Sequence, residues 1–376
     1  MEKTVFLAKC ENYRPYEVKA AVQRILEGFG GLETFAKKGQ KVLLKPNLVM
    51  ASGPENAATT HPEIVLAVAQ AFLGIGCHVT IADSSGGPYH PSLLKRLYER
   101  TGMDSISTKS KAVLNFDTGS KLVEYAEGHT AKAFTLIQPV LDTDVIINLG
   151  KMKTHGLTYY TGAVKNCFGC IPGLTKPVLH SRYPDPKVFC SMLVDLCECI
   201  KPGLSLIDGI VGMERHGPTG GQPKRAKVLI GARNPHAADL AAVHIMGFRP
   251  EQVPTLMEAI GRGLIPSSYK ELQLLGDPVS QFETSFLPAR KDGKTLLKLV
   301  PRPLRPKAEN LLTPYPVIHP ETCVGCGECV RTCPQKTICL EKRKAAINYS
   351  RCIRCYCCQE LCPRRAISLK RMLRCP

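Results

Sequence analysis

Short apolar runs alternate with longer amphipathic stretches over residues 1–285. The short runs are rich in Val, Ile and Leu, as strands are, and the longer stretches repeat apolar residues at helical spacing. This pattern predicts strands at Val5–Ala8, Lys41–Leu44, His78–Ala82, Val145–Leu149, Leu204–Ile207 and Lys227–Ile230. It predicts helices at Tyr16–Phe29, Pro62–Gly74, Ser92–Arg100, Lys187–Ile200, Ala238–Met246 and Val253–Gly263. Because strands and helices alternate, we expect an α/β domain in which helices flank a largely parallel sheet.

Polar and glycine-rich segments follow several of the predicted strands. They are Lys45-Pro-Asn47, Asp83-Ser-Ser-Gly-Gly87, Lys151-Met-Lys-Thr-His155 and Asp208-Gly-Ile. In open α/β sheets the ligand crevice lies beyond the carboxyl ends of the strands. We therefore expect one shared site there, whose substrate- or cofactor-binding residues are Lys45, Asn47, Asp83, Ser84, Lys151, Lys153, Thr154, Asn166 and Lys176.

The stretch from Lys151 to His180 is the richest in chemistry. It holds four Lys, two His and an Asn among glycines, with few acidic residues to neutralise them. Such a set can clamp a carboxylate or phosphate, and a Lys among other cations can act as a nucleophile or acid. We expect Lys165, His155 and His180 to be catalytic, although a solvated loop of surface lysines is the alternative. A second glycine-rich loop, His216 to Arg225, is either an anion cradle or a hairpin turn.

Two cysteine runs near the C-terminus have the spacing of bacterial two-cluster ferredoxins. Cys323, Cys326, Cys329 and Cys333-Pro form one run, and Cys352, Cys355, Cys358 and Cys362-Pro form the other. In that pattern the fourth Cys of each run ligates the other cluster. We therefore expect two [4Fe–4S] clusters in a domain at 319–376, the first held by Cys323, Cys326, Cys329 and Cys362 and the second by Cys352, Cys355, Cys358 and Cys333. Structural zinc is the alternative, but two complete runs, each followed by Pro, disfavour it.

The remaining cysteines give weaker signals. Cys167 and Cys170 have metal or redox spacing, with Cys190, Cys197 and Cys199 about a helix later. A third metal site is one interpretation, and buried cysteines acting as small apolar residues is the favoured one. Cys357 falls off the ligand spacing and is predicted to be a bystander. The polar residues of the N-terminal domain are also compatible with a further, unidentified cofactor or metal there.

Composition and charge narrow the class of protein. A length of 376 residues predicts two or three domains. No signal peptide is recognisable, and no uncharged apolar run is long enough to span a membrane, so we expect a cytoplasmic protein. In such a protein the 18 cysteines favour metal binding over disulfides. The net charge is +18, and residues 286–376 hold 19 Lys and Arg against 6 acids. An acidic electron-transfer protein, a ferredoxin or flavodoxin, is therefore the expected partner. Residues 286–318 are rich in Pro and basic residues and are predicted to be a linker.

The chain resembles the family grouped as domain of unknown function 362, in the subset with an appended ferredoxin domain. The matching residues are Lys45-Pro-Asn47, Thr60-His61-Pro62, Asp83-Ser84, the Lys151 to His180 stretch, Asp208-Gly209, Glu214, Gly217-Pro218 and Asp239. This resemblance implies an α/β fold with two clusters and does not specify a reaction. The order His155, Gly162, Lys165, Pro172-Gly173 and His180 is also similar to the active-site block of the nickel-pincer lactate racemase family, which implies that these Lys and His residues line a pocket. The chain lacks that family's Asp-x-Thr-Arg-Pro run, so shared architecture is expected without nickel or racemase chemistry.

These observations favour a redox enzyme. Its clusters would pass electrons to an anionic substrate or cofactor in the crevice, so that the chain would act as a reductase. The alternative is a non-catalytic electron carrier or maturation subunit that docks on a partner enzyme. Nucleic-acid binding is disfavoured, because the basic C-terminal region lacks interleaved aromatic residues.

Overall fold

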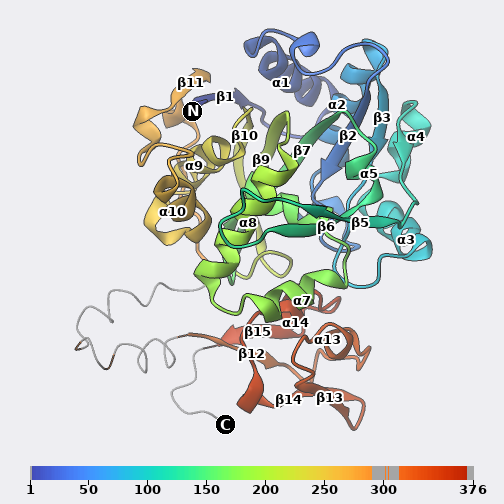
Figure 1. The fold of residues 1–376 in the computed structure, drawn as a ribbon, viewed down its shortest axis with the longest axis vertical. Coiled ribbons are helices and arrows are strands. Elements are labelled where there is room, and N and C mark those ends of the chain that lie inside the picture. Colours follow the sequence, from blue (N-terminus) through green and yellow to red (C-terminus); the bar gives the residue numbers. More distant parts are fainter. Residues whose placement is uncertain (1, 290–300, 302–303, 305–312, 371–376) are drawn as a thin grey trace.

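The computed structural model describes residues 2–289, 301, 304 and 313–370 (Figure 1). Most of the predicted linker lies outside these residues. Within the described part of the chain, no helix combines the length and apolar character that crossing a membrane requires.

A nine-stranded sheet forms the centre of the N-terminal region. Its order is β11-β1-β10-β9-β7-β2-β3-β4, with β8 paired to β7. The strands are β1 (Thr4–Lys9), β2 (Lys41–Pro46), β3 (His78–Ile81), β4 (Val113–Leu114), β7 (Val145–His155), β8 (Tyr159–Thr161), β9 (Leu204–Glu214), β10 (Gln222–Ala232) and β11 (Gln273–Gly276). Five of the pairings are parallel, and the antiparallel ones involve β10 or β8. The sheet is thus mainly parallel and mixed, which confirms the predicted class.

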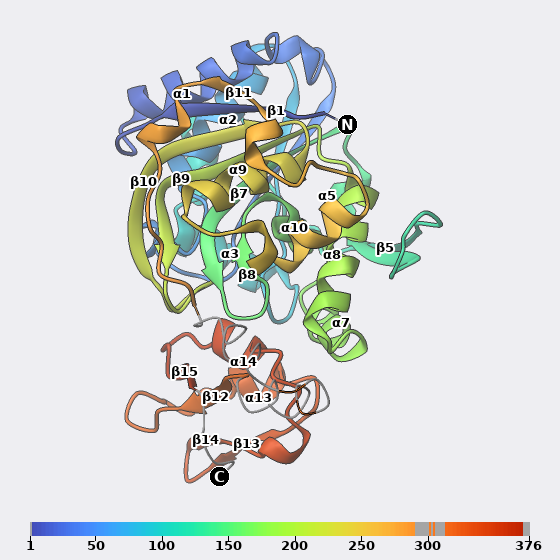
Figure 2. The same cartoon turned by 90° about the vertical axis from the view of Figure 1, so that its left-hand side faces the viewer.

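Helices cover both faces of this sheet (Figures 1 and 2). One face carries α1 (Pro15–Gly28), α2 (Pro62–Gly74), α3 (Pro91–Thr101) and α4 (Asp104–Lys109). The other carries α6 (Ala163–Asn166), α8 (Pro186–Ile200), α9 (Pro235–Ile245) and α10 (Pro254–Gly261). Burial on both faces explains why the central strands are apolar without alternation. Two short helices, α5 (Gln138–Leu141) and α7 (Thr175–Arg182), and a separate hairpin, β5 (Ser120–Glu124) with β6 (Ala133–Ile137), complete the region.

The longer helices begin with Pro in the first turn, and in α2, α3, α8 and α9 the residue before it also caps the helix with its side chain. His61, for example, accepts a hydrogen bond from the Glu63 amide through Nδ1 at 3.2 Å, and Pro62 begins α2. Proline suits this first position, because its missing N–H would have no partner there. All six predicted helices and all six predicted strands are present; most ends shift by a few residues, and β7, β9 and β10 are several residues longer than predicted.

Strands β7 and β9 run further than predicted. The segment Lys151–His155, which we expected to follow a strand, belongs to β7, and Asp208 lies inside β9. The two strands are parallel neighbours, and Lys151 Nζ lies 2.7 Å from Asp208 Oδ2. Pairing across the sheet neutralises both buried charges, which allows the strands to continue through polar residues.

The C-terminal region is a small unit of strands and short helices. Strand β12 (Tyr315–Ile318) pairs with β15 (Ile367–Lys370), and β13 (Ile338–Glu341) pairs with β14 (Lys344–Ile347), all antiparallel. Helices α13 (Glu328–Arg331) and α14 (Cys357–Glu360) lie between them. Strand β12 begins inside the range that the sequence assigned to the linker.

Helix α14 lies on the side of this unit that faces the α/β region (Figure 2). The loop between β9 and β10 contacts it: Thr219 Oγ1 donates to the Glu360 carbonyl at 2.9 Å, and Gln359 Nε2 donates to the His216 carbonyl at 3.2 Å. This loop joins two antiparallel neighbours, so the hairpin alternative for the glycine-rich segment is correct.

Candidate functional site

A crevice pocket of about 580 Å³ lies between the carboxyl ends of the central strands and helix α14. Seven residues that the sequence singled out line it: Asn47, Asp83, Ser84, Lys165, Asn166, Lys176 and His180. The C-terminal unit contributes Cys357, Glu360 and Leu361 to the same pocket. The pocket is therefore shared by the two regions of the chain.

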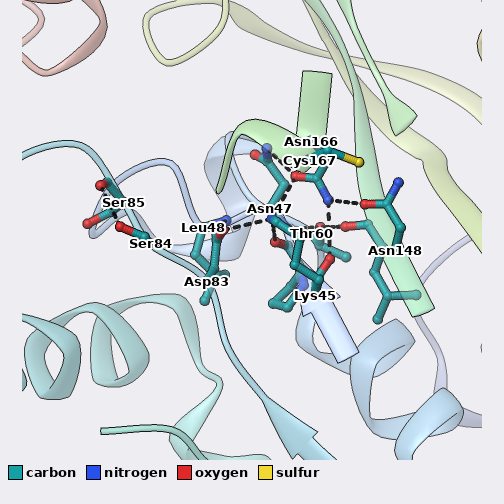
Figure 3. Close-up of polar contacts among 12 residues, drawn as sticks. Lys45, Asn47, Leu48, Thr60, Asp83, Ser84, Ser85, Asn148, Asn166 and Cys167 are labelled. Carbon is teal, nitrogen blue, oxygen red and sulfur yellow. Dashed lines mark hydrogen bonds and ion pairs between the residues drawn. The ribbon is translucent and has the colours of Figure 1, made fainter. Parts of the chain in front are cut away.

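Asn166, at the end of α6, is the centre of the pocket's hydrogen-bond network (Figure 3). Its Oδ1 accepts from Asn47 Nδ2 at 2.9 Å, and its Nδ2 donates to Asn148 Oδ1 at 2.8 Å and to the Lys45 carbonyl at 3.2 Å. Asn47 Oδ1 in turn accepts from Lys153 Nζ at 2.7 Å. These bonds fix the orientation of both amide groups that reach the pocket.

A buried ion pair supports one wall of the pocket. Lys45 Nζ lies 2.7 Å from Asp83 Oδ1, and the two side chains are 0% and 3% exposed. The other carboxylate oxygen of Asp83 accepts from the Leu48 amide at 2.6 Å. Asp83 lines the pocket but its oxygens are already engaged, so it stabilises the strand ends rather than offering a free carboxylate.

Four of the expected binding residues lie behind the pocket rather than in its wall. Lys45, Lys151, Lys153 and Thr154 are all buried. Burial lowers the pKa of Lys151, and burial with the nearby Lys165 and Lys151 holds that of Lys153 well below its usual value. Lys153 donates to Asn47 and to the Ala58 carbonyl, while Thr154 donates to the Arg215 carbonyl. The structure thus gives these four residues positioning contacts.

Two lysines supply the positive charge of the pocket wall. Lys176 donates to the carbonyls of Ser84 and Ser85, and its burial lowers its pKa to about 7. Lys165 Nζ lies 5.7 Å from the centre of the Phe168 ring, and that ring also lines the pocket. Near neutral pH, Lys176 can therefore exchange a proton while a neighbouring cation holds an anion.

His180 reaches the pocket from α7 as a neutral imidazole. Burial lowers its pKa to about 3, and its ring stacks on Phe189 at 4.2 Å between centroids. The stacking fixes the ring plane, so the imidazole can serve as a hydrogen-bonding group of fixed orientation.

His155 is fully buried and contacts the C-terminal unit. Its Nδ1 accepts from the amides of Leu157 and Thr158 at 3.0 and 3.3 Å, which leaves Nε2 as the protonated nitrogen. Nε2 lies 3.0 Å from Glu360 Oε1, although the pair does not have hydrogen-bond geometry. Burial lowers the pKa of His155 to about 4. Burial raises the pKa of Glu360, but His155 and Lys165 outweigh this effect and lower it to about 2.

Eight cysteines of the C-terminal unit surround two cavities of about 350 and 360 Å³. The outer cavity is lined by Cys323, Cys326, Cys329 and Cys362, and the inner cavity by Cys333, Cys352, Cys355 and Cys358. Backbone amides four residues further on donate to the sulfurs of Cys333 and Cys362, at 3.3 and 3.2 Å. Four thiols around one cavity, with hydrogen bonds to sulfur, form a donor set that fits an iron–sulfur cluster.

Sequence reasoning missed the residues that the C-terminal unit contributes to the pocket. Cys357, predicted to be a bystander, lines both the inner cavity and the crevice pocket. Glu360 and Leu361 follow the last cysteine of the inner set, and Leu361 packs against Gly86. The cysteine spacing predicts the C-terminal unit, but it does not indicate which residues of that unit contact the α/β region.

Comparison with known proteins identifies two regions of the chain. The model of the family described as domain of unknown function (DUF362) matches residues 42–244, and a 4Fe-4S dicluster domain matches residues 315–363. A thylakoid-associated protein of Synechocystis sp. is 32% identical over 271 residues, which are 71% of this chain and 82% of that protein.

Two solved structures are also similar. The lactate racemase apoprotein from Thermoanaerobacterium thermosaccharolyticum has a TM-score of 0.41 and 12% identity, over 64% of this chain and 57% of its own. A protein from Thermotoga maritima has a TM-score of 0.38 and 12% identity, over 62% of this chain and 59% of its own. The match therefore spans less than two thirds of either structure.

The family match extends over more than half of the chain. The dicluster domain gives the chain a capacity for electron transfer. The chain belongs to the DUF362 family and carries a 4Fe-4S dicluster domain in its C-terminal region.

Proposed function

We propose that this chain is a reductase that uses two [4Fe–4S] clusters to deliver electrons to an anionic substrate in the crevice pocket. Cys323, Cys326, Cys329 and Cys362 would hold one cluster in the outer cavity. Cys333, Cys352, Cys355 and Cys358 would hold the other in the inner cavity. Bound there, such clusters supply single electrons at low potential.

The observation that carries this proposal is the position of Cys357. It contributes to the wall of the inner cavity and to that of the crevice pocket. One residue thus separates the space for a cluster from the space for a substrate. A pocket directly beside the inner cavity is what electron transfer from a cluster to a small molecule requires.

The pocket wall suits an anion that must gain a proton as well as electrons. Lys165 would hold a carboxylate or phosphate, and Lys176, whose pKa is about 7, would donate the proton from Nζ. The fixed amides of Asn47 and Asn166 would orient the substrate. Helix α14 would exclude water from the side that faces the inner cavity.

Electrons would enter through the outer cavity. Cys326 is exposed there, and the basic side chains of Arg331, Lys344 and Arg364 are exposed on the segments that form or flank this cavity. An acidic ferredoxin or flavodoxin is the donor whose charge complements this surface.

Reoxidation of the reduced protein tests the proposal. The purified, cluster-loaded chain would be reduced without oxygen and mixed with a panel of small carboxylates and phosphates, while the visible absorbance of the clusters is recorded. We expect at least one compound to reoxidise the protein, and we expect Lys165→Ala and Lys176→Met to slow that reaction at least about tenfold. Lys121→Ala, on an exposed strand remote from the pocket in the described structure, is the matched control.

Two results would count against the reductase. Reoxidation at the same rate in the Lys165 and Lys176 variants would place the reaction outside the pocket. Native mass spectrometry that finds only the chain with its clusters, together with no reoxidising compound, would favour the carrier or maturation subunit.

A further inference from the structure

Three side chains of types that bind metal ions meet outside the crevice pocket. Cys197 and Glu198 lie near the end of α8, and His236 lies in the first turn of α9. One ligand atom from each lies within 4.8 Å of the other two. His236 Nε2 is 2.9 Å from Glu198 Oε1. Thiolate, carboxylate and imidazole are the three ligand types that zinc takes from proteins.

A second thiol lies beside the first. Cys167 Sγ is 3.8 Å from Cys197 Sγ, and both residues are buried. Two thiolates on one tetrahedral zinc ion, each with a Zn–S bond of about 2.3 Å, would also be about 3.8 Å apart. The separation between these sulfurs therefore already matches that of two ligands of one ion.

The histidine gives an independent indication of a missing partner. His236 is 1% exposed. Its Nε2 is hydrogen-bonded to Glu198 Oε1 at 2.9 Å, whereas its Nδ1 has no hydrogen-bond partner among the described residues and is the nitrogen left to bind an ion. Buried polar atoms without a partner are rare in folded proteins, and a bound ion or water is a usual explanation. Cys197, Glu198 and His236 line an open cavity, and Lys201 and Arg233 lie in its wall.

We propose that Cys197, Glu198 and His236, joined by Cys167 after a small shift of its side chain towards the ion, form a binding site for a zinc-like divalent cation. Two thiolates and one carboxylate give three negative charges against the two positive charges of the ion. Lys201 and Arg233 on the adjoining wall offset the excess, and the cavity gives the ion a path from solvent. The site is separate from the cysteines of the C-terminal unit.

The position of the site indicates what the ion would do. Cys167 directly follows Asn166, the centre of the pocket network, and begins a short helix, η3 (Cys167–Cys170). The ion would tie this segment to α8 and α9, which cover the same face of the sheet. It would thereby hold Lys165 and Asn166 in place from behind, as a structural ion rather than a reacting one.

Metal analysis of the cluster-loaded full chain tests this proposal. The protein would be equilibrated without oxygen in micromolar free zinc, passed through a desalting column and analysed for zinc and iron. We expect about one zinc per chain, bound by sulfur and nitrogen or oxygen in X-ray absorption. Cys197→Ala and His236→Gln should lose the zinc with iron unchanged, while Cys190→Ala, a buried cysteine of the same helix, should keep it.

If Cys197→Ala or His236→Gln fails to fold, a milder variant still tests whether the site binds zinc. Glu198 is partly exposed, so Glu198→Gln preserves the packing of α8, and we expect it to weaken zinc binding at least about tenfold. Absence of zinc in the wild-type protein, or equal zinc in the wild type and the Cys197→Ala and Glu198→Gln variants, would overturn the proposal.

Discussion

His155 Nε2 lies 3.0 Å from Glu360 Oε1, and this contact joins the last residue of β7 to the last residue of α14. His155 is fully buried, and the side chain of Glu360 is 12% exposed. The pair therefore anchors the C-terminal unit at the edge of the crevice pocket. The inner cavity reaches the pocket through the same helix.

Loss of this contact should loosen the docking of the C-terminal unit. We expect Glu360→Ala to destabilise the docked state by about 1–3 kcal/mol, because the buried imidazole of His155 would lose the carboxylate that it faces at 3.0 Å. Hydrogen exchange of residues 353–362 should rise, while iron content stays unchanged. Glu328→Gln, at an exposed pair with Arg331, is the control. Unchanged exchange in Glu360→Ala would show that the other contacts of α14 suffice.

Acid should destabilise the folded protein through its buried histidines. Burial lowers the pKa of His155 to about 4 and that of His180 to about 3, from an ordinary value of 6.5. The unfolded chain therefore binds more protons than the folded one below pH 6.5, so stability is lost as the pH falls from 6.5 towards 4. Each such histidine contributes at most about 1.4 kcal/mol per pH unit in that window.

Anaerobic urea unfolding at pH 7.5, 6.5 and 5.5 measures this loss. His180→Phe keeps a ring that can stack on Phe189 and removes one titrating group, so its loss between pH 6.5 and 5.5 should be smaller. His78→Gln, at the exposed start of β3, should behave like the wild type. Equal slopes for all three proteins would contradict the assignment.

The rate of the proposed reaction should fall as the pH rises through about 7. Burial lowers the pKa of Lys176 to about 7, so its ammonium form is lost above that pH, and with it both a charge for the anion and a proton to donate. Lys176→Arg keeps the charge at all these pH values but donates no proton. We therefore expect binding of the reoxidising compound to become independent of pH between 7 and 9 in that variant, while the rate drops at least about tenfold. An unchanged pH profile would remove Lys176 from the reaction.

The sequence predicts the elements better than the contacts between them. Cysteine spacing alone predicts the two groups of four that the structure places around separate cavities. Alternating apolar runs likewise predict the main strands and helices, because each element buries its own apolar face. Glu360 could not be found in this way, since its partner His155 lies 205 positions earlier and the docking of two units brings them together.

The sequence also could not predict which polar residues line the crevice pocket and which are buried behind it. Lys153 and Lys165 are similar in sequence context, yet Lys153 is buried on Asn47 whereas Lys165 lines the pocket. Lys153 is in β7 and Lys165 is in α6, so the path of the backbone decides which lysine faces the substrate space. The order of residue types along the chain does not reveal how the backbone runs in space.

The buried pair of Lys45 and Asp83 should be strongly coupled. The two charged atoms are 2.7 Å apart and almost fully excluded from solvent. Lys45→Met leaves the Asp83 carboxylate buried without its counter-ion, so we expect it to cost about 3–5 kcal/mol of unfolding free energy. Combining it with Asp83→Asn should recover part of that loss, because no unpaired charge remains, and anaerobic urea unfolding of the two single variants and the double variant gives the coupling energy. The same cycle on the exposed pair of Arg331 and Glu328 is the control and should give a coupling energy below about 1 kcal/mol. A coupling energy for Lys45 and Asp83 no larger than this would mean that their ion pair does not stabilise the pocket wall.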